Sequence, residues 1–197
     1  MIPKQLLVDL YSKQGLSSAQ IAKREKCSAT KIDYWLSKYE IPKRSISDAI
    51  YKKRNPKGDP FLFQKPKTIS TAILYGLGIG LYWGEGTKRS KNSVRLGNSD
   101  PFLIRKFIQF LEVLYSIDIR RLKFGLQIFG DMNGEEALTF WIKSLKAKRE
   151  QFYAPIITPH RGVGNYRRKT KYGVLTLYFN NKKLRDIICS AIDQESR

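Results

Sequence analysis

Apolar residues recur at helical spacing in three short segments of the first 40 residues. Gly15 ends the first segment, and Ser17 opens the second with a capping-box pattern that Gln20 completes. Ser28 is positioned to cap the third segment. The pattern therefore predicts a small domain of three helices at residues 1–53.

Residues 54–67 show no such periodicity. The stretch Lys52–Pro60 is basic, polar and interrupted by prolines, which predicts a linker at residues 54–67. From residue 68 to residue 197, helical and alternating patterns follow one another and predict an α+β domain. The expected elements in chain order are a glycine-rich helix at 70–86, a hairpin at 87–98, a helix at 101–114, a strand at 121–129, a helix at 135–148, an extended segment at 153–159, a strand at 172–179 and a helix at 181–192.

The glycine-rich helix is the unusual element. We expect Ser70 to cap its beginning and Gly86 to end it. A glycine inside a helix costs roughly 0.5–1 kcal/mol relative to alanine, so the small residues must serve a purpose. Gly76, Gly80 and Gly84 are four residues apart and share one face, which favours close approach of a second helix. The run is too short for a bilayer, which requires about 20 apolar residues.

Glu85 lies at the carboxyl end of this helix, where the helix dipole disfavours an acid. If the second helix is the same helix of another subunit, a two-fold axis brings two Glu85 carboxylates together. Two neighbouring carboxylates stay ionised at low cost only with a cation between them. Oxygen ligands favour Mg²⁺ as that cation.

The run from Gly78 to Gly86 resembles the LAGLIDADG motif of homing endonucleases. The agreement lies at Gly80, Leu81, Gly84, Glu85 and Gly86, whereas Trp83 departs from the motif at its first aspartate. The resemblance implies that two such helices meet at an interface and that Glu85 binds the divalent metal, Mg²⁺ or Mn²⁺, that supports DNA cleavage. On the same resemblance, we assign Gly84 to this metal site. The implied dimer interface comprises Gly76, Gly80, Tyr82, Trp83 and Gly84.

The family resemblance also implies an αββαββα core, which here spans roughly residues 69–194. The expected order of elements departs from that core in two ways. One helix is inserted between the third and fourth strands, and the first strand is very short. At the amino terminus, a helix, a short turn and a second helix resemble a helix-turn-helix, whose second helix enters the major groove of DNA.

The net charge of +20 and the isoelectric point near 10.0 point to a polyanionic partner. Nucleic acid is the commonest such partner, and a ribosomal or generally basic protein is the alternative. His160 is the sole histidine, which excludes histidine-metal nucleases and a Ser-His triad within one chain. Cys27 and Cys189 are far apart, so neither a zinc site nor a disulfide framework is expected. With no signal or membrane-spanning segment, we expect a cytoplasmic, nucleoid-associated protein without a small-molecule substrate.

Basic, amide, hydroxyl and aromatic side chains on the predicted recognition helix, the strand faces and a basic loop are the candidate DNA contacts. They are Thr30, Lys31, Tyr34, Arg95, Arg121, Lys123, Gln127, Arg161, Arg167, Arg168 and Lys169. The candidate cations that could balance transition-state charge beside Glu85 are Lys88, Arg95, Lys169 and Lys171. The alternatives are a three-helix unit with no nucleic-acid contact and strand faces that are merely solvated.

One motif per chain implies a homodimeric double-strand DNA endonuclease that cleaves a near-palindromic site by Mg²⁺-dependent phosphodiester hydrolysis. Two other functions stay open. A LAGLIDADG relative that has lost cleavage can act as a transcription regulator, which the helix-turn-helix also suits. An RNA-splicing maturase requires aromatic residues on loops for stacking, and Tyr166 and Tyr172 are the only weak candidates.

Overall fold

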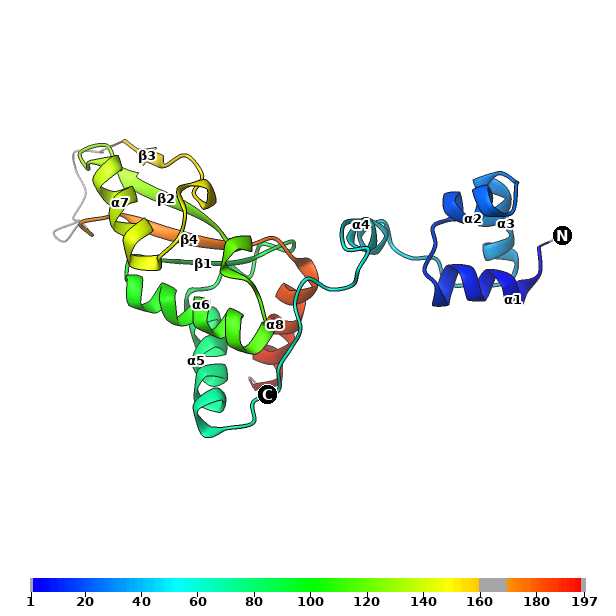
Figure 1. Ribbon diagram of the computed structural model, residues 1–197, viewed down its shortest axis with the longest axis horizontal. Coiled ribbons are helices and arrows are strands. Elements are labelled where there is room, and N and C mark those ends of the chain that lie inside the picture. The colour runs from blue at the N-terminus through cyan, green and yellow to red at the C-terminus, as the bar shows by residue number, and fades with distance from the viewer. Residues whose placement is uncertain (1, 160–169, 196–197) are drawn as a thin grey trace. The chain divides into compact units, whose positions relative to one another are not determined.

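The computed structural model describes residues 2–159 and 170–195 (Figure 1). The chain divides into two compact units, Met1–Asp59 and Pro60–Arg197. The described residues form eight α-helices and one four-stranded mixed sheet, so the expected α+β class is confirmed. No helix among these residues has the length and apolar character needed to cross a membrane.

Unit 1 contains the three expected helices and one more. The elements are α1 (Lys4–Leu7), which continues as a π-helical turn (Val8–Lys13), α2 (Ser18–Arg24), α3 (Ala29–Lys38) and α4 (Ile46–Arg54). Ser17 and Gln20 form the expected capping box of α2, and the Ser28 side chain caps α3. Leucine and isoleucine side chains from the first three helices close a separate small core, to which α4 contributes no buried residue.

Unit 2 is built on the sheet. Its elements are α5 (Ile69–Glu85), β1 (Val94–Asn98), α6 (Pro101–Tyr115), a 3₁₀ turn (Ile119–Arg121), β2 (Lys123–Phe129), α7 (Gly134–Leu145), a second 3₁₀ turn (Arg149–Gln151), β3 (Ile156–Thr158), β4 (Val174–Phe179) and α8 (Lys182–Glu195). The strand order is β1-β4-β2-β3. β4 is antiparallel to both β1 and β2, whereas β3 runs parallel to β2.

The expected hairpin at 87–98 is wrong. Residues 87–93 form a loop. A bridge between Gly86 and Leu96 joins its start to β1, and the Thr87 amide donates to the Arg95 carbonyl at 2.9 Å. These loop residues are all polar or basic, so a first strand would bury no apolar side chain. β4 takes its place beside β1, and the extended segment at 153–159 supplies β3. The additional helix, α7, therefore follows the second strand of the chain and not the third.

The segment before α5 belongs partly to unit 2. Phe61 is buried in the core of that unit, and the backbone amides of Leu62 and Gln64 donate to the carbonyls of Tyr115 and Leu114 at the end of α6. The second half of the expected linker is therefore a strap that lies against the carboxyl end of α6. Its apolar residues Phe61 and Phe63 explain this, because they contact the ring of Tyr115.

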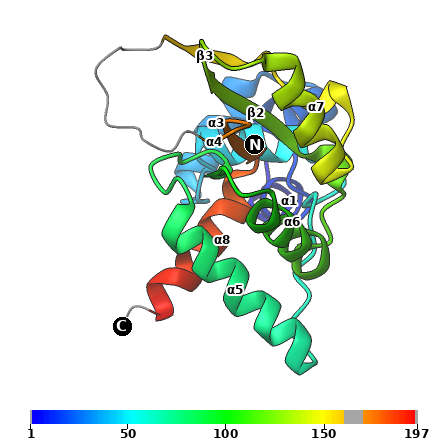
Figure 2. The ribbon, with the colours of Figure 1, turned by 90° about the vertical axis from the view of Figure 1, so that its left-hand side faces the viewer.

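α5 begins and ends with clear signals. Thr68 caps the helix by accepting from the Thr71 amide at 3.2 Å, so the expected cap at Ser70 is wrong by two residues. Gly86 ends the helix as expected, although its backbone is extended and not left-handed. Figure 2 shows α5 beside α6 and α8, and α5 also contacts β1.

The glycines of α5 fall on two faces. Gly78 is buried, and a Cβ atom at this position would lie 2.2 Å from the Phe110 ring of α6. Gly76, Gly80 and Gly84 are exposed, and a Cβ atom at each would have no neighbour within 4 Å. Gly78 therefore permits the contact between α5 and α6, whereas the other three glycines border open space.

This difference predicts opposite effects of two alanine substitutions. Gly78→Ala overpacks the contact with Phe110, which typically costs 1–3 kcal/mol, so we expect a net loss of about 1–2 kcal/mol after the gain in helix propensity. Gly76→Ala, the matched control, should stabilise the monomer by roughly 0.5–1 kcal/mol. Urea unfolding followed by circular dichroism measures both values. Equal effects of the two substitutions would contradict this packing.

Candidate nucleic-acid interface

One face of α5 is apolar and is left uncovered by the residues that the structure describes. Ile73 is 65% exposed, Leu77 is 43% exposed and Trp83 is 48% exposed. The predicted interface glycines, Gly76, Gly80 and Gly84, lie on the same exposed side of the helix. An apolar helix face with small residues at its centre is suited to close packing against another helix.

Tyr82 does not belong to this face, so its assignment to the interface is corrected. Its side chain is fully buried and stacks on Phe107 of α6, with ring centroids 5.9 Å apart. Burial raises the pKa of Tyr82, and nearby Cys189 adds to the effect. The helical period could have shown this, because Tyr82 is two residues from both Gly80 and Gly84 and so about 200° around the helix.

Glu85 is the last residue of α5 and is exposed. Within the described residues, its carboxylate has no hydrogen bond and no ion pair, and the neighbouring Gly84 leaves space beside it. The part of the chain that the structure describes contains no group of three or more histidine, cysteine or acidic residues that could hold a metal ion. One chain therefore offers a single free carboxylate here, and further ligands must come from a second chain, a substrate or water.

The candidate cations fall in different places. Lys88 lies in the loop after Glu85, and its Nζ donates to the Trp83 carbonyl at the end of α5. Arg95 borders the same loop, where its Nε donates to the Ser93 hydroxyl at 2.8 Å. Lys171 precedes β4 and pairs instead with Glu136 of α7, at 3.9 Å, so the structure does not bring it to Glu85.

The sheet presents an open face with polar and basic side chains. The strand register aligns Arg95 of β1 and Lys123 of β2 on either side of Tyr178 in β4. The guanidinium of Arg95 lies over the Tyr178 ring at 5.2 Å from its centroid. In the next row, Thr176 of β4 lies between Gly97 of β1 and Gly125 of β2. No side chain projects from the sheet at the two glycine positions.

The remaining sheet candidates are held by neighbouring groups. The Nζ of Lys123 donates to the Glu150 carbonyl at 2.9 Å, and the amide of Gln127 donates to the Thr158 hydroxyl at 3.0 Å. Arg121 lies outside the strand, in the turn before β2, where it donates to the Pro60 carbonyl at 3.1 Å. Arg95, Lys123 and Gln127 therefore share one face, whereas Arg121 lies at its margin.

Sequence reasoning did not identify Tyr178, Thr176 and Tyr153 as part of this face. Tyr178 and Thr176 alternate with buried residues of β4, so the sequence pattern could have placed them on the exposed face of the strand. Their alignment with Arg95 and Lys123 follows only from the strand register. Tyr153 lies outside a regular strand and packs edge-on against Tyr178, with ring centroids 5.8 Å apart. No local pattern could reveal that contact.

Unit 1 offers a second exposed polar surface on α3. Thr30, Lys31 and Tyr34 are all exposed, as expected for a helix that contacts DNA. The Ser18 hydroxyl of α2 donates to the Asp33 carboxylate at 2.6 Å, so a polar contact joins α2 to the same helix. The structure places these side chains at the surface but identifies no partner for them.

Several candidates lie in a segment that the structure does not describe. Arg161, Arg167, Arg168, Lys169 and the alternative stacking residue Tyr166 fall within residues 160–169. Tyr172, the other stacking candidate, is packed face to face on Phe140 of α7, with ring centroids 3.8 Å apart. Its ring therefore already has an aromatic partner within the protein.

Comparisons with family models, with curated proteins and with solved structures found no match to this chain. The resemblance to the LAGLIDADG family therefore stays a prediction that rests on the motif around Glu85.

Proposed function

We propose that this protein is a site-specific double-strand DNA endonuclease that resembles the LAGLIDADG homing endonucleases and carries an amino-terminal helix-turn-helix. The observation that supports the proposal most is the position of Glu85. This free carboxylate ends a helix whose glycine-rich apolar face is uncovered, and the following loop leads into a sheet with a basic open face.

The proposed active form is a homodimer. An exposed row of glycines lets the backbones of two helices approach closely, and the flanking apolar side chains of Ile73, Leu77 and Trp83 supply buried area. A two-fold axis along this face brings the two Glu85 carboxylates together. Each chain then reads one half of a near-palindromic DNA site.

The residues at the end of α5 fit a divalent metal ion such as Mg²⁺ or Mn²⁺. Glu85 supplies an unpaired carboxylate, and the family resemblance adds a backbone contribution from Gly84. When bound, the metal would polarise the scissile phosphate and activate a water molecule. Lys88 lies in the following loop and Arg95 borders it, so these two described cations are the candidates to stabilise added negative charge.

DNA recognition is proposed to combine two surfaces. Arg95, Lys123 and Gln127 on the open sheet face offer hydrogen-bond donors to phosphates and base edges. Thr30, Lys31 and Tyr34 on α3 extend the contact from unit 1. With a net charge of +20, affinity should fall steeply as salt concentration rises.

A DNA-binding regulator without cleavage is the second candidate. It is supported by unit 1, which has its own core and an exposed polar helix. The retained carboxylate at position 85 favours cleavage, because a negative charge gives no advantage to a protein that only binds a polyanion.

The test is selection of a DNA target from a randomised library, followed by incubation with and without Mg²⁺. We expect staggered double-strand cleavage that EDTA abolishes and that added Mg²⁺ or Mn²⁺ restores. Tight binding without metal-dependent nicking would favour the regulator instead.

The sheet face leads to a separate prediction. Lys123→Ala should weaken binding about equally for all sequences and reduce the slope of log affinity against log salt by about 1, as for loss of one phosphate contact. Gln127→Ala should instead relax preference at one base pair of each half-site, at a cost of about 1–3 kcal/mol. Binding titrations at several salt concentrations, with the selected site and its single-base variants, measure both effects. The proposed roles would be contradicted if Lys123→Ala relaxed preference at one base pair while Gln127→Ala weakened binding equally for all sequences.

A further inference from the structure

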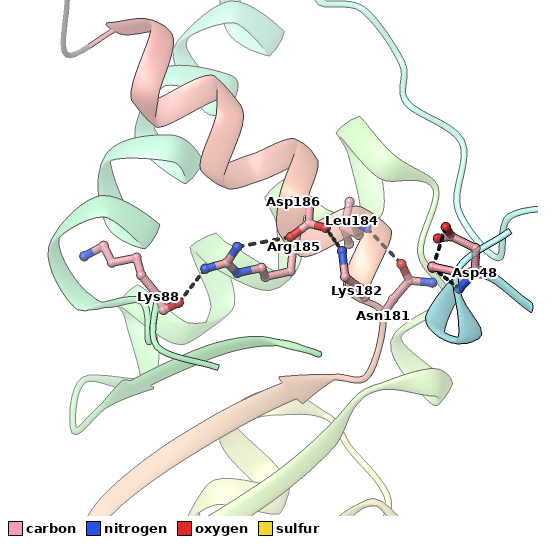
Figure 3. A network of polar contacts seen from close by, with 8 residues as sticks. Asp48, Lys88, Asn181, Lys182, Leu184, Arg185 and Asp186 are labelled. Atoms are coloured by element: carbon pink, nitrogen blue, oxygen red, sulfur yellow. Dashed lines mark hydrogen bonds and ion pairs between the residues drawn. The ribbon is translucent and has the colours of Figure 1, made fainter. Parts of the chain in front are cut away.

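The loop that follows Glu85 is connected to α8 through one side chain, Arg185. Its Nη2 donates to the Lys88 carbonyl at 2.5 Å, and its Nη1 donates to the Asp186 carboxylate at 3.1 Å (Figure 3). Asp186 also accepts from Lys182 one turn earlier. Lys88 and Arg185 are 97 residues apart in the chain, so this contact joins the loop after α5 to the last helix of unit 2.

The guanidinium of Arg185 is largely withdrawn from solvent, since the side chain is only 19% exposed. Burial raises the pKa of Asp186, but hydrogen bonds from Lys182 and Arg185 outweigh this effect and leave the pKa below its usual value. Asp186 therefore stays ionised at neutral pH and holds Arg185 in place. A charged donor fixed in this way makes a stronger contact with a carbonyl than a neutral donor does.

Arg185 also approaches the core side of α5. Its Nε atom and the hydroxyl of Tyr82 are both buried, and neither has a hydrogen-bond partner within residues 2–159 and 170–195. Arg185 lies close enough to the Tyr82 hydroxyl to lower its pKa, against the larger effect of burial. Tyr82 is one helical turn before Glu85. Arg185 therefore lies near α5 just before Glu85 and contacts the Lys88 carbonyl just after Glu85.

The other contacts of the loop are polar, and they include the Ser90 amide with the Thr87 carbonyl at 3.4 Å and the Ser90 hydroxyl with the Ser93 hydroxyl at 3.0 Å. The Thr87 amide donates to the Arg95 carbonyl, and Lys88 Nζ donates to the Trp83 carbonyl. The side chains of Thr87, Lys88 and Arg89 are exposed, and this segment forms no strand. A loop with little buried apolar area keeps one geometry only if polar contacts hold it.

We propose that Arg185 is a positioning residue for the catalytic end of α5. By holding the Lys88 carbonyl, it sets the path of residues 86–90 and thereby the position of Glu85 and Lys88 toward the scissile phosphate. This inference rests on the proposed endonuclease function. Misplacement of a catalytic group by about 1 Å can slow a reaction about 100-fold without loss of binding.

The experiment uses Arg185→Ala in the full chain, with Arg105→Ala as the matched control. Arg105 also donates to a backbone carbonyl, that of Ser144 at 3.2 Å, but on the exposed surface of α6. We expect Arg185→Ala to speed amide hydrogen exchange in residues 86–90 at least about tenfold, with α6 and β2 unchanged. Single-turnover cleavage should fall about 30–100-fold while DNA affinity stays within about threefold. Added guanidinium ion should restore both exchange protection and cleavage.

Unchanged exchange in residues 86–90 would overturn the inference. So would a uniform rise in exchange through α6 and β2 without recovery in guanidinium, because it would make Arg185 a general stability residue. A wild-type protein that binds its target but never cleaves it overturns the proposed function, and with it the catalytic role of Arg185. The exchange measurement then still decides whether Arg185 holds the loop.

Discussion

Replacement of Glu85 by glutamine is expected to abolish metal-dependent DNA cleavage while DNA binding persists. Glutamine has the same shape as glutamate but lacks the charge that a divalent cation requires. Loss of about 4 kcal/mol of transition-state stabilisation corresponds to a rate on the order of 10³-fold lower. Affinity for DNA should stay the same or rise slightly, because one negative charge is removed beside the phosphates. Cleavage assays and gel-shift titrations on the selected target measure the two properties separately.

The control for this prediction is Glu112→Gln, which removes the same charge from the exposed side of α6. We expect this variant to cleave as the wild-type protein does. If Glu85→Gln cleaves at the wild-type rate, the carboxylate at the end of α5 holds no catalytic metal. The regulator would then be the better explanation for a protein that binds the target tightly.

Replacement of Gly80 by leucine is expected to convert the DNA-bound homodimer into a monomer that does not cleave both strands. Gly80 lies in the open row on α5, where an added Cβ atom has no neighbour within 4 Å among the described residues. Leucine also favours helix more than glycine does, so the monomer should remain folded and gain roughly 0.5–1 kcal/mol. In the dimer, however, the bulky side chain separates two backbones that must approach closely. Sedimentation with and without target DNA measures the association.

The matched control is Gln109→Leu, which adds the same apolar side chain to an exposed position of α6. This variant should assemble and cleave normally. A Gly80→Leu protein that remains dimeric on DNA would show that another surface forms the interface. A wild-type protein that is monomeric on its target would remove the basis for pairing the two Glu85 residues.

Local signals predicted much of the secondary structure. The capping box of Ser17 and Gln20, the cap at Ser28 and the end of α5 at Gly86 were readable because each depends on residues within one turn. The polar run at 87–93 forms a loop and not the first strand of the expected hairpin, because it contains no apolar side chain that a strand would bury. Caps and periodicity are local, so they can be recognised without knowledge of the fold.

The candidate site was only partly predictable. Glu85 and the glycine row were visible as a motif on one helix, whereas the alignment of Arg95, Tyr178 and Lys123 required the order of the strands. The contact of Arg185 with the Lys88 carbonyl joins segments far apart in the chain, and no spacing rule indicates it.

The sequence by itself determined the α+β class, the beginnings of α2 and α3, the end of α5 at Gly86 and an acid at the end of a glycine-rich helix. These features follow from backbone propensity and from periods of two and 3.6 residues, which act over short stretches. The tertiary structure decided that Gly78 faces Phe110 while the other three glycines of α5 remain uncovered, and that Lys171 pairs with α7 and not with Glu85. Those outcomes depend on which distant segments pack together, because burial and charge pairing are set by contacts between elements and not by neighbours along the chain.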